Sequence, residues 1–478
     1  MSDPQRWVYE FIALIVDIGR AAVGKLRVWG SRLDARRCVD TLRLYGASEY
    51  WRIPLRASTR IYPMTDRDFA VAVVRRLREA GHVAYWAGGC VRDELLGETP
   101  ADYDVATAAR PAEVVALFRR TVEVGAAFGV VEVVGPRWPD GSHPVVQVAT
   151  FRSDGVYLDG RRPESVMYST AEQDAERRDF TINGMFFDPL DGQVIDYVGG
   201  RADLQARILR AIGDPRARFR EDKLRLLRAV RLAARFSFPI EPATAAAVRE
   251  MAPEITAVSA ERIAEELRKM LAHPQRESAV RTLADLGLVP HVLPEVANDA
   301  VGWVHALAVI AALDGPRWPA PGAVTFPLAF AALLSAVGKA KAAAACRRLK
   351  LANDETECVA WLVERRDALG EAPTMRPSRL YPLLVHPGIG DLLALHRAIA
   401  EAASRPTNHV EFCERLLNET PAEVLNPPPL LTGDDLVALG WPPGPVFKRA
   451  LDTIRAAQLD GTILTRDAAI SLANTFAV

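Results

Sequence analysis

The pattern of hydrophobic residues changes near residue 200, and this change constrains the fold more than any other feature. Between about residues 65 and 200, β-branched runs such as GVVEVVG and PVVQVATFR alternate with segments of helical spacing such as DRDFAVAVVRRLREAG. After about residue 200 the apolar residues follow helical spacing alone, as in EDKLRLLRAVRLAARF. Strands that alternate with helices are typical of an α/β domain, so the pattern predicts an α/β head followed by an all-helical region. The length of 478 residues agrees with more than one domain.

The charge of the chain is balanced overall but uneven locally. The formal net charge is −1 at pH 7, which gives no general attraction to nucleic acid. Residues 201–235, however, contain eleven Arg and Lys against four Asp and Glu, a local charge of +7. A solvated helix face does not need such an excess. We therefore expect any nucleic-acid surface to be a local basic patch.

Cysteine usage and the N-terminal segment indicate the compartment. The five cysteines are scattered and form no C-x-x-C pair, which argues against a disulfide framework or a structural zinc site and favours a reducing cytoplasm. The apolar segment WVYEFIALIVDIG is short and is interrupted by Glu10 and Asp17. It predicts an amphipathic helix rather than a membrane span, and no secretory signal is recognisable. We expect a cytoplasmic protein without membrane association or a stable protein partner.

The segment AGGCVRDELLGETPADYDVAT, residues 87–107, combines two glycines, an arginine and two nearly adjacent carboxylates. Gly88 and Gly89 follow an apolar run and open a helix, so their N–H groups can approach an anion closely, and Arg92 can add a contact to a phosphate. Asp102 and Asp104 would lie on one face of a strand, where Mg²⁺ can join them to substrate phosphates. A lone D-x-D is most often a solvated turn. The combination favours a nucleoside-triphosphate site.

The segment ERRDFTINGM, residues 176–185, offers a second group of polar side chains. Arg178 can bind phosphate, and Asp179 can accept a hydrogen bond from a ribose hydroxyl. A charged first turn of a helix explains the same residues equally well. Taken alone, this segment does not distinguish a nucleotide-binding site from an ordinary helix start.

The segment FREDKLRLLRAVRLAARF, residues 219–236, predicts one helix with a basic face. Asp222, Arg225 and Arg228 step by three along it, Arg231 follows, and Glu221 lies four residues before Arg225. Aspartate only accepts hydrogen bonds and arginine only donates them, so this pair on one rigid helix matches the amino group and ring nitrogen of cytosine or adenine. Guanine and uracil present the reverse pattern and would leave polar groups unpaired. The alternative is an ordinary solvated basic face.

Together these segments resemble the motifs of the class II tRNA nucleotidyltransferases, the CCA-adding enzymes, and of the closely similar bacterial poly(A) polymerases. Five motifs occur in the order of that family: GGCVRDELLG…DYDVAT, RRDFTING, DYVGGRADL, EDKLRLLRAVRLAARF and SAERIAEELRKML. They cover about residues 60–290, and LLTGDDLVALGWPPGPVFKRALDTI resembles the tail of bacterial members more weakly. The resemblance implies a polymerase-β-like α/β nucleotidyltransferase head followed by an all-α neck, body and tail. It divides the chain into an N-terminal extension of unknown role (1–60), the head (61–200), a helical neck with the base-selecting helix (201–290) and a helical, RNA-binding body and tail (291–478).

The resemblance also implies the reaction, namely template-independent addition of C and A to the 3′ end of tRNA from CTP and ATP, with Mg²⁺ and release of pyrophosphate. The expected partners are CTP, ATP and the 3′ end, acceptor and elbow regions of tRNA. Asp102 and Asp104 are the implied catalytic and metal-binding residues. The implied nucleotide-binding residues are Gly88, Gly89, Arg92, Arg178, Asp179, Glu221, Asp222, Arg225, Arg228 and Arg231.

Three positions depart from the family pattern, and one of them is Gly184, where relatives usually have Ala, so local stiffness can differ. Gln147 stands where many relatives carry Glu, which puts a third carboxylate at the metal site in doubt. Lys223 stands where Pro is common, and we expect this change to be harmless.

Three alternatives remain open. The chain can be a CC-only or A-only adding enzyme, although the loop in FRSDGVYLDGRRPE favours competence for A addition. It can be a poly(A) polymerase, although VGAAFGVVEVV lacks the extra basic residues that we associate with those enzymes. Finally, it can be a non-catalytic RNA-binding protein, against which the presence of both carboxylates argues.

Overall fold

The computed structural model describes residues 65–125, 129–154, 166–297, 299–313, 324–441 and 444–476. The predicted N-terminal extension with its apolar segment, Cys38 and most of the loop in FRSDGVYLDGRRPE lie outside these residues. In the described part, no helix is long and apolar enough to cross a membrane.

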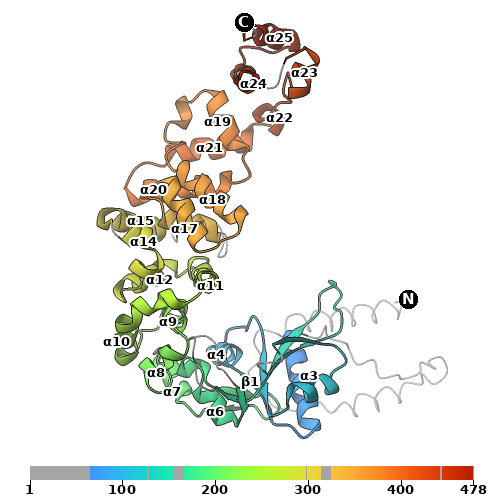
Figure 1. Ribbon diagram of the computed structural model, residues 1–478, viewed down its shortest axis with the longest axis vertical. Helices are drawn as coiled ribbons and strands as arrows, with labels where there is room; N and C mark the ends of the chain where they lie inside the picture. The colour runs from blue at the N-terminus through green and yellow to red at the C-terminus, as the bar shows by residue number, and fades with distance from the viewer. Residues whose placement is uncertain are drawn as a thin grey trace, which may run out of the picture. The chain divides into compact units, whose positions relative to one another are not determined.

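The first third of the described chain is built on a seven-stranded mixed sheet (Figure 1). The strand order is β3-β4-β5-β2-β1-β8-β9, and the neighbours are antiparallel except for the parallel pair β2 and β5. The strands are β1 Ala84–Ala87, β2 Asp104–Thr107, β3 Thr121–Gly125, β4 Val130–Val134, β5 Val145–Thr150, β8 Phe186–Asp188 and β9 Gln193–Ile195, and a separate hairpin pairs β6 Arg152–Asp154 with β7 Val166–Tyr168. This sheet carries the predicted α/β head.

The helix α3 Asp66–Glu79 precedes the first strand and packs against β1, β2 and β5, and it illustrates why the helices of the head form. Thr65 and Asp68 make a reciprocal capping box at its start. Phe69, Val73 and Leu77 recur at helical spacing and are buried. The other helices of the head are α4 Gly89–Leu96, α5 Pro111–Leu117, α6 Ala171–Glu176 and the 3₁₀ turn η2 Thr181–Asn183.

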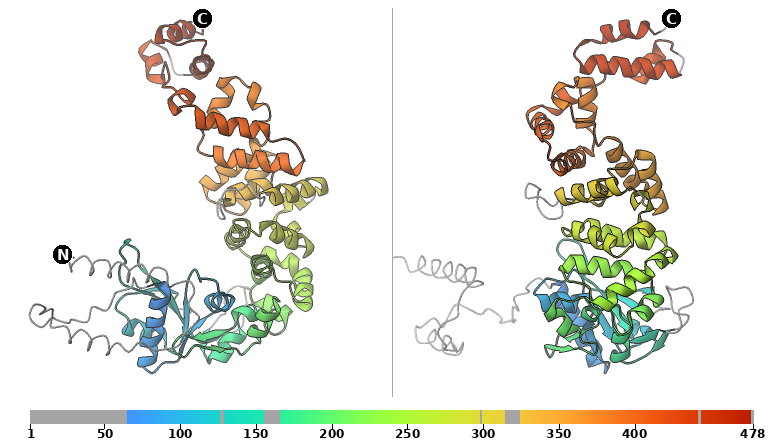
Figure 2. Two further views of the ribbon diagram at one scale, coloured as in Figure 1. Left: turned by 180° about the vertical axis from the view of Figure 1, so that it is seen from behind. Right: turned by 90° about the vertical axis from the view of Figure 1, so that its left-hand side faces the viewer.

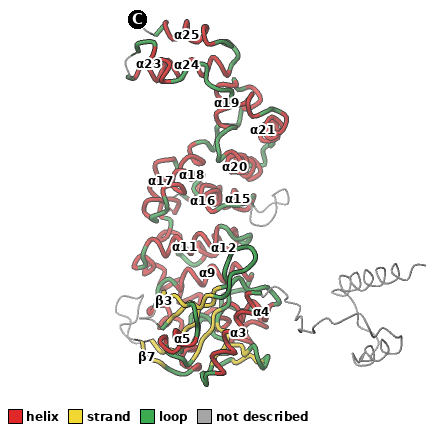
Figure 3. The backbone as a smooth tube through the Cα atoms, turned by 90° about the vertical axis from the view of Figure 1, so that its right-hand side faces the viewer, coloured by secondary structure: helices red, strands yellow, loops and turns green. Residues whose placement is uncertain are grey.

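Every named element of the described chain after β9 is a helix, as the views in Figures 2 and 3 show. The first group is α7 Gly200–Ala206, α8 Pro215–Glu221, α9 Arg225–Phe236, α10 Pro242–Met251, η3 Ala252–Ala257, α11 Ala260–Leu271, α12 Arg276–Asp285, α13 Val289–Val292 and α14 Pro294–Ala297. The second group is α15 Ala300–Ala312, α16 Phe326–Leu333, α17 Lys339–Arg348, α18 Asn353–Glu364, η4 Ala372–Thr374, α19 Pro377–Leu384, α20 Ile389–Ala402 and α21 Asn408–Glu419. The last elements are α22 Ala422–Leu425, α23 Gly433–Ala438, α24 Pro445–Leu459 and α25 Arg466–Asn474. The fold class predicted from the change of pattern near residue 200 is therefore confirmed.

The helix α9 is the element that matters most for the site. Its apolar face, which includes Leu227, Val230 and Ala234, is buried, and α9 packs against α11 and α12. The burial of each such leucine contributes about 2 kcal/mol to folding. The arginines are thereby held on the opposite face, at fixed positions along a rigid element.

One predicted element is wrong. The segment 219–236 is not one helix, because α8 ends at Glu221 and α9 begins at Arg225. Asp222 lies between them as the C-cap of α8, with extended backbone angles of φ −144° and ψ 105°. The prediction that Asp222 and Arg225 share one helix is thus corrected, although they remain three residues apart across a tight turn.

Candidate active site

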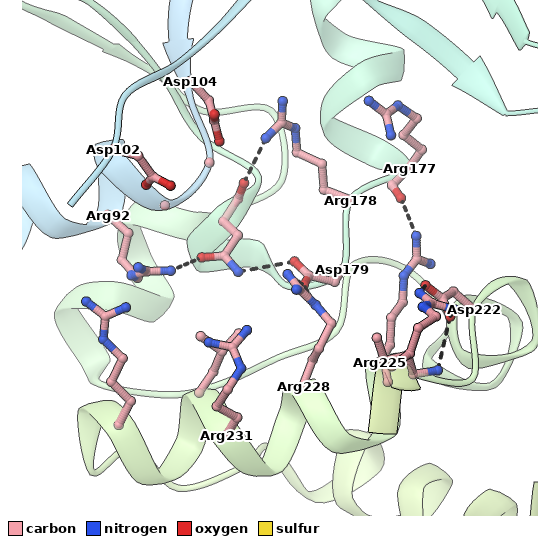
Figure 4. A pocket seen from close by; sticks show the side chains of 17 residues that line it. Arg92, Asp102, Asp104, Arg177, Arg178, Asp179, Asp222, Arg225, Arg228 and Arg231 are labelled. Atoms are coloured by element: carbon pink, nitrogen blue, oxygen red, sulfur yellow. Dashed lines mark hydrogen bonds and ion pairs between the residues drawn. The ribbon is translucent and has the colours of Figure 1, made fainter. Parts of the chain in front are cut away.

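A cavity of about 500 Å³ lies between the head and the arginine face of α9 (Figure 4). Every predicted site residue except Glu221 lines it. Eight arginines and four aspartates are among the lining residues, which are Gly88, Gly89, Arg92, Asp102, Asp104, Arg177, Arg178, Asp179, Asn183, Asp222, Leu224, Arg225, Arg228, Arg231, Leu232, Arg235 and Arg262. This surplus of positive charge in a chain of net charge −1 suits an anionic ligand.

The glycine turn at one end of the cavity depends on the absence of side chains. Gly88 caps α4 with φ 77°, in the region that glycine favours. A Cβ atom on Gly88 would lie 3.0 Å from Nη1 of Arg178. The turn therefore brings backbone and an arginine together, and α4 opens there with its first N–H groups at the cavity.

Arg92 is held in place by three different partners. The residue is 4% exposed, and its guanidinium pairs with Asp93, with 2.6 Å between Nη2 and Oδ1. It also donates to the side-chain oxygen of Asn183 and lies over the ring of Phe236, 4.5 Å from the ring centre. Burial lowers the pKa of Arg92, and Asp93 partly opposes this effect. The side chain is thus ordered without a ligand.

Asp102 and Asp104 meet at the same wall of the cavity, but not as predicted. The strand β2 begins at Asp104, so Asp102 lies in the loop before it rather than two positions along a strand. Burial, together with repulsion from Asp102, raises the pKa of Asp104 to about 6, and Arg178 opposes the shift. Two carboxylates that repel each other and have no ion pair among the described residues fit a divalent cation between them.

A third carboxylate does not join this pair. Gln147 on β5 stands opposite Asp104 in the parallel register, but it is exposed and does not line the cavity. Among the described residues, no group of three or more His, Cys, Asp or Glu side chains could hold a metal ion. Two aspartates plus substrate phosphates are therefore the available ligand set.

Asp179 lies in the middle of the cavity wall and joins the head to α9. It accepts from Arg228 at 2.6 and 2.8 Å and from Asn183 at 3.2 Å, and its own neighbour Phe180 donates a backbone N–H to it. Burial alone would raise the pKa of Asp179, but Arg228 and Arg225 hold it well below its usual range. Since both oxygens already accept hydrogen bonds, a ribose hydroxyl would be an additional donor, and that contact stays a prediction.

The far end of the cavity holds the residues predicted to select the base. Asp222 forms a two-point pair with Arg262 of α11, at 2.7 and 3.1 Å. Arg225 is 8% exposed and donates to the carbonyls of Arg218 and Arg177 and to Glu221. The role of Glu221 is therefore to hold Arg225 from outside the cavity. Of the five N–H bonds of the guanidinium, these contacts use three, which leaves donors for a ligand.

Sequence reasoning missed several residues that shape the cavity. Arg177, Asn183, Arg235 and Arg262 line it, and Glu266 of α11 is buried against Arg231 at 2.6 Å. Arg262 and Glu266 are four apart in SAERIAEELRKML, one of the five family motifs, so their shared face was visible in the sequence. The pairing of Arg235 with Asp93 joins residues 142 positions apart, and no local pattern could have revealed it.

Comparison with known proteins gives the family. Residues 84–210 match the model described as the poly A polymerase head domain, and residues 237–299 match that of the probable RNA and SrmB- binding site of polymerase A. The CCA-adding enzyme of Geobacillus stearothermophilus is 34% identical over 402 residues, which are 82% of this chain and 93% of that protein. The chain belongs to the family of class II CCA-adding enzymes.

Further relatives agree with this family. The crystal structure of the Bacillus stearothermophilus CCA-adding enzyme in complex with CTP superimposes with a TM-score of 0.69 at 29% identity, over 86% of this chain and 98% of that one. The CCA-adding enzyme of Bacillus subtilis is 42% identical over 215 residues, which span 45% of this chain and 52% of that protein. The earlier resemblance to CCA-adding enzymes, drawn from five motifs, is thereby confirmed.

Proposed function

We propose that this protein adds C and A nucleotides to the 3′ end of tRNA without a template, using CTP and ATP and releasing pyrophosphate. The observation that carries the proposal is the single cavity described above, which has two aspartates suited to a metal at one end and a fixed Asp–Arg pair at the other. A nucleoside triphosphate has the same polarity, with its phosphates at one end and its base at the other.

At the phosphate end, we propose that Asp102 and Asp104 hold Mg²⁺. When bound, the metal lowers the pKa of the RNA 3′-hydroxyl and neutralises charge on the α-phosphate. The chain itself supplies the α4 N-terminus at Gly88 and Gly89, together with Arg92 and Arg178, to bind the triphosphate. The 3′-oxygen then attacks the α-phosphorus in line, and pyrophosphate leaves.

At the base end, we propose that Asp222 accepts from the exocyclic amino group and Arg225 donates to the ring nitrogen. Both residues are fixed by Arg262, Glu221 and backbone carbonyls before any base arrives. Cytosine and adenine share the required pattern, whereas uracil and guanine would leave the pair unsatisfied. This is selection by the protein alone, which removes the need for a template.

We further propose a cytoplasmic location for the reaction. The four cysteines in the described part, Cys90, Cys346, Cys358 and Cys413, are free thiols, which suits a reducing compartment.

The decisive experiment offers Mg²⁺ and one nucleotide at a time to three RNAs: tRNA lacking its 3′ end, tRNA ending in CC, and an unstructured RNA. We expect CTP to extend the first and ATP the second, with little use of the third. Incorporation of ATP into any RNA without use of CTP would instead support a poly(A) polymerase. Use of only one of the two tRNAs would support a CC-only or A-only enzyme.

The variant Asp102→Ala tests the metal proposal in the same assay. We expect turnover to fall by about 10³-fold or more, because one of the two protein ligands of the metal is lost. Binding of tRNA should be unchanged. Retained turnover would refute the metal assignment, and absence of incorporation by the wild type with intact tRNA binding would favour a non-catalytic RNA-binding protein.

A further inference from the structure

Asp174 lies outside the cavity but contacts two of the arginines that line it. It belongs to α6, is 1% exposed, and is absent from the motifs recognised in the sequence. Its Oδ1 accepts from Nε and Nη2 of Arg177 at 3.0 and 2.7 Å, and its Oδ2 accepts from Nε and Nη2 of Arg178 at 3.2 and 2.9 Å. One buried carboxylate thus binds two consecutive guanidinium groups, each through two donors.

The two arginines connect Asp174 to both ends of the cavity through their contacts. Arg178 lies over the ring of Phe186 and donates to the carbonyl of Asn183, which turns its remaining donors toward Gly88 and Asp104 (Figure 4). Arg177 offers its backbone carbonyl to Nη2 of Arg225, at 2.9 Å. The segment fixed by Asp174 therefore contacts the glycine turn on one side and the base-selecting arginine on the other.

Asp174 is charged in this environment. Burial raises its pKa, but Arg178 and Arg177 lower it further, so that the net shift is downward. This charged, buried acceptor takes four guanidinium donors, besides the backbone N–H of Arg152, and so holds two long side chains in place. Arginine loses much rotamer freedom when it binds a phosphate, and here that loss has occurred before the ligand arrives.

We propose that Asp174 is a positioning residue that presents Arg178 to the phosphates of the incoming nucleotide and fixes Arg177, whose backbone carbonyl holds Arg225. This inference rests on the proposed function, because it assumes that the glycine-turn end of the cavity binds the triphosphate. Asp174 does not line the cavity, so it acts on a ligand through the two arginines, and it also accepts from the backbone N–H of Arg152 at 3.3 Å. Its removal should weaken binding in proportion to the phosphates that a ligand carries.

The test measures binding by calorimetry, without catalysis, of CTP and CMP to the full chain. We expect Asp174→Asn to weaken CTP binding about tenfold or more, because charge-assisted hydrogen bonds are lost, and CMP binding by less than about threefold. Asp174→Glu keeps the charge but shifts the carboxylate, and it should show the same preference for loss of CTP binding. This second variant keeps the test valid if Asp174→Asn does not fold.

Asp203→Asn is the matched control. Asp203 is also a buried carboxylate on a short helix, and it accepts from Arg210 at 3.1 Å and from Thr181 at 2.7 Å, but it does not line the cavity. We expect this variant to lower the melting temperature while leaving CTP binding unchanged. A loss of CTP affinity equal to that of Asp174→Asn would show that general destabilisation explains both.

A double-mutant cycle decides whether Asp174 acts through the arginines. In the background Arg177→Gln/Arg178→Gln, the further change Asp174→Asn should have no effect on CTP affinity. A full additive loss, or equal losses for CTP and CMP, would overturn the inference. If the wild type does not bind CTP at all, the proposed function fails; if it binds CTP and Asp174→Asn binds equally well, only this inference fails.

Discussion

At the residue scale, the cavity consists of side chains whose positions are set before any ligand binds. Asp222 is held by Arg262, and Arg225 is held by Glu221 and two carbonyls. Such preorganisation means that a base with the wrong pattern cannot be accommodated by rotation of these groups. Discrimination between bases then follows from hydrogen bonds left unmade rather than from steric size.

The variant Arg225→Ala tests this basis for base choice. We expect the preference for CTP over UTP to fall by about 100-fold, because the donor to the ring nitrogen of cytosine is lost and the N3–H of uracil no longer faces a competing donor. Competition between CTP and UTP on tRNA lacking its 3′ end provides the measurement. Arg235→Ala is the control, since Arg235 lines the cavity beside Asp93, and it should reduce affinity for both nucleotides without changing their ratio. Unchanged selectivity in Arg225→Ala would mean that this arginine does not read the base.

At the element scale, the break between α8 and α9 positions the base-selecting pair, and it was hidden in the sequence. The apolar spacing from Phe219 through Leu227 suits a continuous helix, and neither Gly nor Pro interrupts it. The break instead involves a tertiary contact, since Arg262 of α11 holds Asp222. The strands β8 and β9 were missed because they have only three residues each, which is too few for a period of two to be recognised in the sequence. The helices with buried faces, in contrast, follow from local spacing.

The variant Lys223→Pro tests the geometry of this break. Asp222 already has the extended conformation that precedes proline, and the N–H of Lys223 donates to no acceptor among the described residues. We therefore expect stability to change by less than about 1 kcal/mol, in urea unfolding of the full chain. The control Leu226→Pro removes the N–H that donates to Lys223 and disturbs a buried position, and it should cost about 3 kcal/mol or more. A large loss in Lys223→Pro would contradict the break.

At the scale of the whole molecule, sequence and structure agree that an α/β head precedes a helical region. This order could be predicted because the spacing of apolar residues along the chain differs between strands and helices. The cavity was predictable only in part. Motifs such as the glycine turn and D-x-D are local, whereas the contacts that fix them link distant segments, as Arg228 does with Asp179, 49 positions away. Long-range ion pairs between arginine and carboxylate leave no periodic signal. These ion pairs nevertheless bring the arginine face of α9 into the same site as the head.

The stability of the helical region should depend on pH through His396 of α20. This side chain is 4% exposed, and its Nε2 lies 2.9 Å from the carbonyl of Arg365. Burial lowers the pKa of His396 to about 4. Between about pH 4 and pH 6.5 the unfolded chain binds a proton that the folded chain does not, so the stabilisation is complete above pH 6.5 and is lost as the pH falls toward 4.

The variant His396→Gln should remove this part of the pH dependence. A shift from the ordinary value of 6.5 to about 4 corresponds to about 3 kcal/mol. Urea unfolding at several pH values between 4.5 and 7 should therefore show a shallower loss of stability in the variant. Asp104 contributes in the opposite direction over part of this range, since its pKa is raised to about 6, but its contribution is the same in both proteins and cancels in the comparison. Parallel pH profiles for wild type and variant would show that His396 titrates alike in the folded and unfolded chains.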